Sequence, residues 1–129
     1  MFLEHCKQHV DTPKKYHILL IVTDGNIHDM SAAKRTLVEL SDYPCSIIII
    51  GVGEEDFSDM QALDSDKKKL KDDDGNVTYR DIVQFVPYTE AIKQHRLGER
   101  VLEELPRQFV DHMIRHDLHP DEAATSINN

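Results

Sequence analysis

The fold is decided by the stretch HILLIVTDG, residues 17–25, in which an unbroken apolar run ends in a carboxylate and a glycine. The five side chains that follow His17 are branched and apolar, and the polarity changes abruptly at Thr23 and Asp24. A continuous apolar run is typical of a strand covered on both faces, as in a parallel sheet flanked by helices. Ligands of such sheets bind at the carboxyl ends of the strands. The stretch therefore predicts a buried strand that carries Asp24 to a site at its tip.

Two further strands are predicted downstream. Residues 45–53 contain four consecutive isoleucines and end in Gly-Val-Gly, so this strand is also expected to lie between layers of helices. Residues 81–88 form a shorter candidate strand that Pro87 closes. Its alternation of Ile82 with Gln84 is typical of an edge strand with one less buried face.

Helices are predicted between and around these strands. Apolar residues recur at helical spacing in residues 1–10, 31–40, 57–63 and from 89 onward, where Pro106 either kinks the last helix or begins a new one. Strands that alternate with helices imply βαβ units, a parallel sheet and right-handed crossovers. We therefore expect an α/β fold with about three strands. The candidate N-cap residues are Asp29 or Ser31, Asp56 and Thr89.

Composition narrows the class of protein. The chain has 129 residues, 40% hydrophobic content and a net charge of -9, with a pI near 5.2. This acidic balance disfavours a nucleic-acid binder or electrostatic attachment to anionic lipid. No apolar run approaches the roughly 18 to 20 residues of a membrane span, and the N-terminus lacks a signal-peptide pattern. Cys6 and Cys45 form no CxxC pair, which favours free thiols in a reducing, cytosolic setting.

Several motifs resemble metal-binding or nucleotide-binding sites, but a simpler interpretation is stronger for each of them. His5 with His9, and His112 with His116, have the i, i+4 spacing of metal ligands. No third ligand stands near His5 and His9 in the sequence, so a solvated helix face is expected there. Asp111 is adjacent to the second pair and makes a zinc site conceivable, but a mixed-charge solvent face is the stronger expectation. Gly51 and Gly53 do not complete a dinucleotide-binding G-x-G-x-x-G pattern.

The charged segment 67–76 contains an acidic run that resembles part of an EF-hand loop. With Gly75 at the sixth position, Asp72, Asp74 and Asp81 occupy ligand positions. The first position would be Leu70, which cannot bind calcium. A solvated loop is therefore the stronger expectation for this segment.

Four stretches in the same order resemble the von Willebrand factor A-type domain of copines. They are LIVTDG at residues 20–25, PCSIIIIGVG at 44–53 and DIVQFVPY at 81–88, followed by VLEELPRQFV at 101–110. The resemblance runs from about residue 16 to 120 and implies a partial doubly wound, Rossmann-like, mostly parallel sheet. Residues 1–120 then correspond to the C-terminal portion of that domain, and residues 121–129 to a polar tail expected to be disordered.

The resemblance also implies a metal site and a cellular setting. Copine A-type domains resemble adhesion domains that hold Mg²⁺ or Ca²⁺ through a D-x-S-x-S loop, a threonine and a later aspartate. Asp24 matches that aspartate, whereas no D-x-S-x-S occurs in this sequence. Asp24 is thus the one predicted metal ligand, in a site expected to be incomplete and weak. Copines bind phospholipid through calcium-dependent C2 domains that this chain lacks, so a cytoplasmic protein with calcium-dependent membrane recruitment of its full-length form is expected.

The predicted function is that of a non-enzymatic protein-interaction module. No Walker A motif, kinase glycine-rich loop, or nucleophile with an adjacent base is present in the sequence. The alternatives are the A-type domain of a RING ubiquitin ligase related to copines, or a metal-independent interaction fragment. The expected partners are target proteins, without nucleic acid, and a membrane only through the C2 domains. Self-association is expected through the strand edge from His17 to Val22, because in the family that strand has a neighbour that this chain does not contain.

Overall fold

The computed structural model describes residues 1–9, 15–64 and 68–118, and its centre is a three-stranded parallel sheet. The strands are β1 (His17–Thr23), β2 (Cys45–Gly51) and β3 (Val83–Pro87), in the order β1-β2-β3. β1 pairs with β2 along its whole length, from His17 opposite Cys45 to Thr23 opposite Gly51. The predicted α/β class with a parallel sheet is confirmed.

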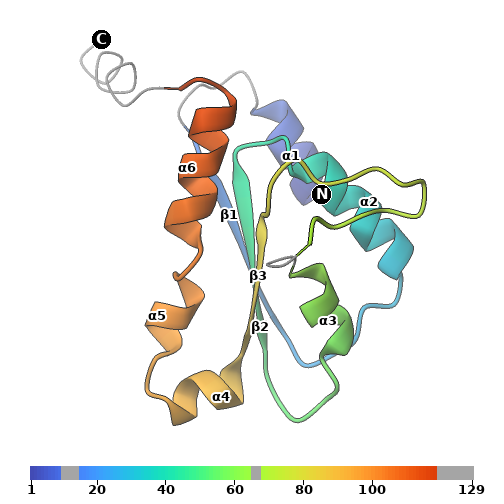
Figure 1. Cartoon of the computed structure of the whole chain (residues 1–129). Coiled ribbons are helices and arrows are strands. Elements are labelled where there is room, and N and C mark those ends of the chain that lie inside the picture. The colour runs from blue at the N-terminus through green and yellow to red at the C-terminus, as the bar shows by residue number, and fades with distance from the viewer. Residues whose placement is uncertain (10–14, 65–67, 119–129) are drawn as a thin grey trace.

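Helices lie on both sides of the sheet (Figure 1). One side carries α1 (Phe2–Gln8), α2 (Met30–Leu40) and α3 (Ser58–Leu63). The other side carries α4 (Tyr88–Lys93), α5 (Leu97–Val101) and α6 (Leu105–Arg115), which follow one another from the bottom to the top of the view. The architecture is therefore a three-layer α/β/α sandwich whose second helical layer stands over β2 and β3.

The apolar core lies between the sheet and the layer of α1 to α3. Its members are buried aliphatic and aromatic side chains, with Leu19 and Ile21 of β1 packed against them at intermediate burial. Packing is closest at Gly51, where an added Cβ would lie 2.9 Å from Phe85 Cζ and 3.0 Å from Phe57 Cε1. The core is made up of Cys6, Leu37, Leu40, Cys45, Ile47, Ile49, Met60, Leu63, Leu70, Ile82, Val83 and Phe85.

Local sequence signals explain where several helices begin. Asp29 is the N-cap of α2, and its Oδ1 accepts a hydrogen bond from the Ala32 N–H at 2.9 Å, as predicted. Pro106 lies in the first turn of α6, so it begins a new helix and does not kink a long one. Thr89 is not an N-cap, because α4 begins one residue earlier at Tyr88.

Two features of the predicted strands are wrong. β3 is an edge strand of the sheet, but it is buried on both faces, and Gln84 is only 4% exposed. The Gln84 amide compensates for this burial by donating to the Arg100 carbonyl and by accepting from the Glu104 N–H at 3.4 Å. β1 is less buried than expected: it was predicted to be covered on both faces, yet every second residue is exposed.

The charged segment before β3 is a structured turn from residue 68 onward. Asp72 accepts hydrogen bonds from the backbone N–H groups of Asp74 and Asn76, at 3.0 and 2.8 Å, and Lys71 forms an antiparallel bridge with Val77. These bonds hold the pKa of Asp72 below its ordinary value, with the Asn76 side chain as the first contributor. The predicted polar tail, residues 121–129, lies outside the described residues.

Candidate interaction site at the free edge of the sheet

β1 has one edge that no described strand covers. The His17 N–H donates to the Pro44 carbonyl at 2.8 Å, and the Thr23 carbonyl accepts from the Val52 N–H at 2.9 Å. Since N–H and C=O of one strand residue point the same way and alternate along the chain, the odd-numbered residues of β1 face β2. The N–H and C=O groups of Ile18, Leu20 and Val22 therefore point away from the sheet.

The side chains of those three residues are also exposed. Ile18, Leu20 and Val22 have exposed fractions of 50%, 54% and 61%, although they lie in the middle of an apolar run. They occupy the face opposite the main core, where α6 contacts β2 and the three side chains stay about half-exposed. Unpaired backbone groups and apolar side chains thus coincide on one strand, and we call Ile18, Leu20 and Val22 the β1 edge. Such an edge is a ready template for an added strand.

The opposite edge of the sheet is closed by local hydrogen bonds. The outward-facing residues of β3 are Val83, Phe85 and Pro87, because the Ile82 carbonyl faces β2 and accepts from the Ile47 N–H. Val83 N–H donates to Asp81 Oδ1 at 3.2 Å, and Phe85 N–H donates to Asp64 Oδ2 at 2.9 Å. Pro87 has no N–H to offer. No outward-facing residue of β3 therefore offers a free backbone N–H to another strand.

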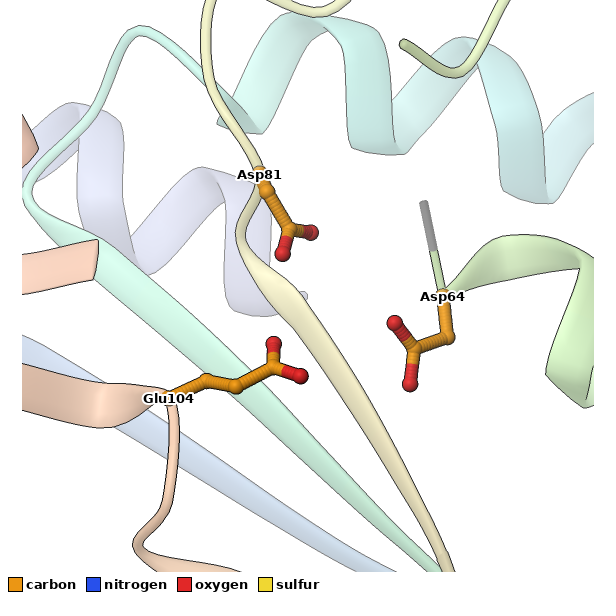
Figure 2. A group of neighbouring side chains, drawn as sticks. All are labelled: Asp64, Asp81 and Glu104. Atoms are coloured by element: carbon orange, nitrogen blue, oxygen red, sulfur yellow. The ribbon is translucent and has the colours of Figure 1, made fainter. Parts of the chain in front are cut away.

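The two carboxylates that close β3 belong to a group of three (Figure 2). Asp64, Asp81 and Glu104 direct their side chains toward one another, with one oxygen of each within 4.8 Å of the others. Arg107 lies at the same place, with Nη2 3.2 Å from Asp81 and 3.6 Å from Glu104. Gln108 Nε2 also donates to Glu104 at 3.3 Å. These interactions give the group a structural role at the β3 edge that sequence analysis did not anticipate.

A buried arginine fixes the amino-terminal end of β1 and β2. Arg80 is 6% exposed, and its Nη2 donates to the carbonyls of Tyr43 at 2.6 Å and Cys45 at 2.8 Å. Tyr16, which precedes β1, donates its hydroxyl to the same Cys45 carbonyl at 3.0 Å and lies 2.6 Å from Ser46 Oγ. Burial raises the pKa of Tyr16, so its hydroxyl stays protonated as a donor. This network anchors the base of the strand that carries the β1 edge.

His112 packs beside this network and is not on a solvated face, which corrects the expectation for the second histidine pair. It is 4% exposed, and its ring lies 6.1 Å from the Tyr16 ring and 4.4 Å from that of His116. Burial, followed by the nearby Arg80 cation, lowers the pKa of His112 to about 4. The imidazole is therefore neutral at pH 7.

Both cysteines are free and buried, as predicted for reduced thiols. Cys45 is fully enclosed at the start of β2, and its Sγ lies 3.5 Å from the Leu40 carbonyl. Burial, with Cys6 alongside, raises the pKa of Cys45 to about 12. A thiol in this state is a poor nucleophile and a poor metal ligand.

Asp24 lies at the carboxyl end of β1, as predicted, and its side chain is exposed. It stands within a turn that the Gly25 N–H closes by donating to Thr23 Oγ1 at 3.2 Å. Within the described residues, the one group of three potential ligands is Asp64, Asp81 and Glu104, so Asp24 belongs to no such cluster. Mg²⁺ and Ca²⁺ need about six oxygen ligands. The described residues around Asp24 therefore do not form a cation site by themselves. Asp72 and Asp74, of the EF-hand-like run for which a solvated loop was the stronger expectation, belong to no such cluster either.

The fold defines a class of protein: an α/β domain with an open, three-stranded parallel sheet flanked by helices, consistent with part of a von Willebrand factor A-type fold. Comparison with known proteins then identifies the family. A family model described as Copine matches residues 1–121. The chain belongs to the copine family.

Two curated relatives come from Arabidopsis thaliana. The chain is 42% identical to Protein BONZAI 2 and 43% identical to Protein BONZAI 1, over 113 residues in each comparison. Each match covers 83% of this chain and 19% of the relative. The chain thus spans about a fifth of the length of these relatives. None of the helices in the described ranges is long and apolar enough to cross a membrane.

Proposed function

We propose that this chain is a non-enzymatic protein-interaction module of a copine-like protein, and that it binds by adding a strand at the β1 edge. The observation that supports this proposal most directly is the difference between the two sides of the sheet. The outward donors of β3 are bonded by Asp81 and Asp64 or absent at Pro87. The outward groups of Ile18, Leu20 and Val22 remain available on an apolar strand.

The occupant that we propose is a second copy of the chain. An antiparallel pairing of two β1 strands about a two-fold axis at Leu20 would place Ile18 of one copy opposite Val22 of the other. Each of the three residues would then donate one hydrogen bond and accept one. Residues 17–22 carry no acidic or basic side chain apart from His17, so two copies of this chain, with net charge -9, would meet where like charges are sparse.

The strength of this contact follows from the exposed apolar area. Ile18, Leu20 and Val22 are each about half-exposed, and completing their burial is worth about 1 kcal/mol per side chain. Two copies bring six such side chains together, against an association cost of several kcal/mol. The six inter-strand hydrogen bonds add about 1 kcal/mol each, so we expect a weak dimer, with a Kd between the micromolar and the submillimolar range.

The rest of a full-length copine-like protein would supply the other functions. Calcium-dependent phospholipid binding and recruitment from the cytoplasm to membranes would depend on C2 domains outside this chain. Target proteins that offer an extended apolar strand would compete for the β1 edge with the second copy. Because Asp24 has no described partner ligands, pairing at the β1 edge is expected to be independent of Mg²⁺ and Ca²⁺.

Sedimentation velocity over micromolar to submillimolar concentrations tests the proposal. The wild-type chain should shift from monomer to dimer with and without EDTA, whereas Leu20→Pro and Leu20→Lys should remain monomeric. Proline at position 20 removes an N–H that points outward, so pairing with β2 is preserved. Leu102→Lys is the matched control, because Leu102 is 55% exposed and Leu20 is 54% exposed. A folded wild-type monomer throughout, or a dimer that survives both Leu20 substitutions, would overturn the proposal.

A further inference from the structure

A cluster of three histidines lies where α1 meets the start of β1. The ring centre of His5 is 4.3 Å from that of His9 and 4.8 Å from that of His17, and the His9 and His17 centres are 5.8 Å apart. His5 and His9 were predicted as a solvated pair because the sequence near them offers no third ligand. The fold supplies that third imidazole from a different element, eight residues beyond His9 and across the connection to β1.

The ring separations agree with a tetrahedral three-histidine zinc site. Zinc binds imidazole nitrogen at about 2.0 to 2.1 Å in tetrahedral geometry, which places the ring centres about 5 Å apart. The three observed separations, 4.3, 4.8 and 5.8 Å, lie on both sides of this value. Imidazole nitrogens suit zinc better than they suit calcium or magnesium, which prefer oxygen.

The surroundings of the ring nitrogens of His9 and His17 are also those expected of metal ligands. His9 Nδ1 lies 2.8 Å from the His5 carbonyl, and since a carbonyl can only accept, Nδ1 carries the proton. The neutral His9 ring then has an unprotonated Nε2, and a ligand histidine commonly donates its other nitrogen to a carbonyl in this way. His17 Nε2 is buried and has no hydrogen-bond partner in the described structure. A bound ion would satisfy this buried nitrogen.

We propose that His5, His9 and His17 form a zinc site, with a water molecule or an external group as the fourth ligand. In the present conformation the nitrogens of the three rings do not converge on one point. Among the described residues, the group that has three ligand atoms within 4.8 Å of one another is the carboxylate cluster at β3, and the histidines do not meet this criterion. Binding therefore requires rotation of at least one imidazole about its Cβ–Cγ bond. The bound ion would tie the C-terminal end of α1 to the first residue of β1.

Titration calorimetry with Zn²⁺ on the untagged, metal-free chain tests the site. The wild-type chain should bind one Zn²⁺ with micromolar or tighter affinity, and His5→Gln, His9→Gln and His17→Gln should each weaken binding by about tenfold or more. His116→Gln is the matched control, because His112 and His116 share the i, i+4 spacing and have a ring separation of 4.4 Å. This control should leave the affinity unchanged.

A second measurement separates loss of a ligand from loss of the fold. Co²⁺ in place of Zn²⁺ should give the visible absorption of a tetrahedral site in the wild type, and this band should be lost in His5→Gln, whose exposed side chain is not needed for folding. No micromolar binding by the wild type would overturn the proposal. Unchanged affinity in a folded His17→Gln chain, or equal weakening by His116→Gln, would overturn it as well.

Discussion

The buried imidazole of His112 gives a quantitative prediction for acid stability. Its pKa is about 4 in the folded protein and about 6.5 in the unfolded chain. A group whose pKa is lower in the folded state binds fewer protons there, so stability rises with pH across this window and falls as the pH drops from 6.5 toward 4. The groups that face His112 are Arg80, His116, Arg115 and Asp42, and of these only Asp42 favours the charged form.

The magnitude follows from the two pKa values. With folded and unfolded pKa values near 4 and 6.5, the linkage relation gives a loss of about 2 kcal/mol between pH 7 and pH 5, and about 3 kcal/mol by pH 4. A domain of this size has a total stability of about 5 to 15 kcal/mol. Protonation of one side chain thus removes a substantial part of the stability, and it does so at pH values well above the pKa values of most carboxylates.

Urea unfolding at pH 7 and at pH 5, followed by circular dichroism, measures this loss. His112→Leu removes the titrating group and keeps an apolar side chain in the buried position. The free energy of unfolding of this variant should therefore fall between pH 7 and pH 5 by about 2 kcal/mol less than that of the wild type. His116→Gln serves as the exposed control and should retain most of the wild-type pH dependence. If the wild type and His112→Leu lose the same free energy between these pH values, the assignment of the acid sensitivity to His112 is refuted.

Four further predictions concern other parts of the structure. Arg80→Met should destabilise the chain by about 2 to 4 kcal/mol in urea unfolding, because it removes the charged hydrogen bonds of the guanidinium to the buried carbonyls of Tyr43 and Cys45; a loss below 1 kcal/mol would contradict the role of Arg80 as an anchor. Gly51→Ala should cost about 1 to 3 kcal/mol, since its Cβ would meet the ring of Phe85, and an unchanged melting temperature would argue against that contact. Cys45 should resist alkylation at pH 8 in the native state and react only on unfolding, so rapid native labelling would show that it is accessible. Calorimetry with Mg²⁺ or Ca²⁺ should detect no site tighter than millimolar, and tight binding abolished by Asp24→Ala would show that further ligands lie near Asp24.

The sequence predicted the strands well because their signal is local. The apolar runs at residues 17–22 and 45–50 have no period of 3.6 and end at glycine or a polar turn, which determines their type and approximate limits. The structure selects one of two predicted alternatives both at Asp29, which was proposed with Ser31 as a cap, and at Pro106, which was proposed to kink or to begin a helix; such signals depend on neighbours three or four residues away. In all these cases the deciding interactions lie within one element.

The parts that could not be predicted depend on contacts between distant segments. Burial of Gln84 needs the Arg100 carbonyl and the start of α6, and burial of His112 needs Tyr16 and Arg80. An apolar run likewise does not show which strand lies at the border of a sheet, so the exposure of β1 on one face was not evident from its composition. The grouping of His17 with the α1 histidines is of the same kind, because the fold joins residues from separate elements.

The closed β3 edge limits how large an assembly of this chain can become. A sheet with two open borders can add copies at both sides and extend into a fibre. Here the donors of one border are bonded by carboxylates or replaced by proline, so two copies joined through β1 would present only closed borders at their outer ends. Growth by strand pairing would then stop at two, and this chain could present an aliphatic strand to partners without the hazard of polymerisation.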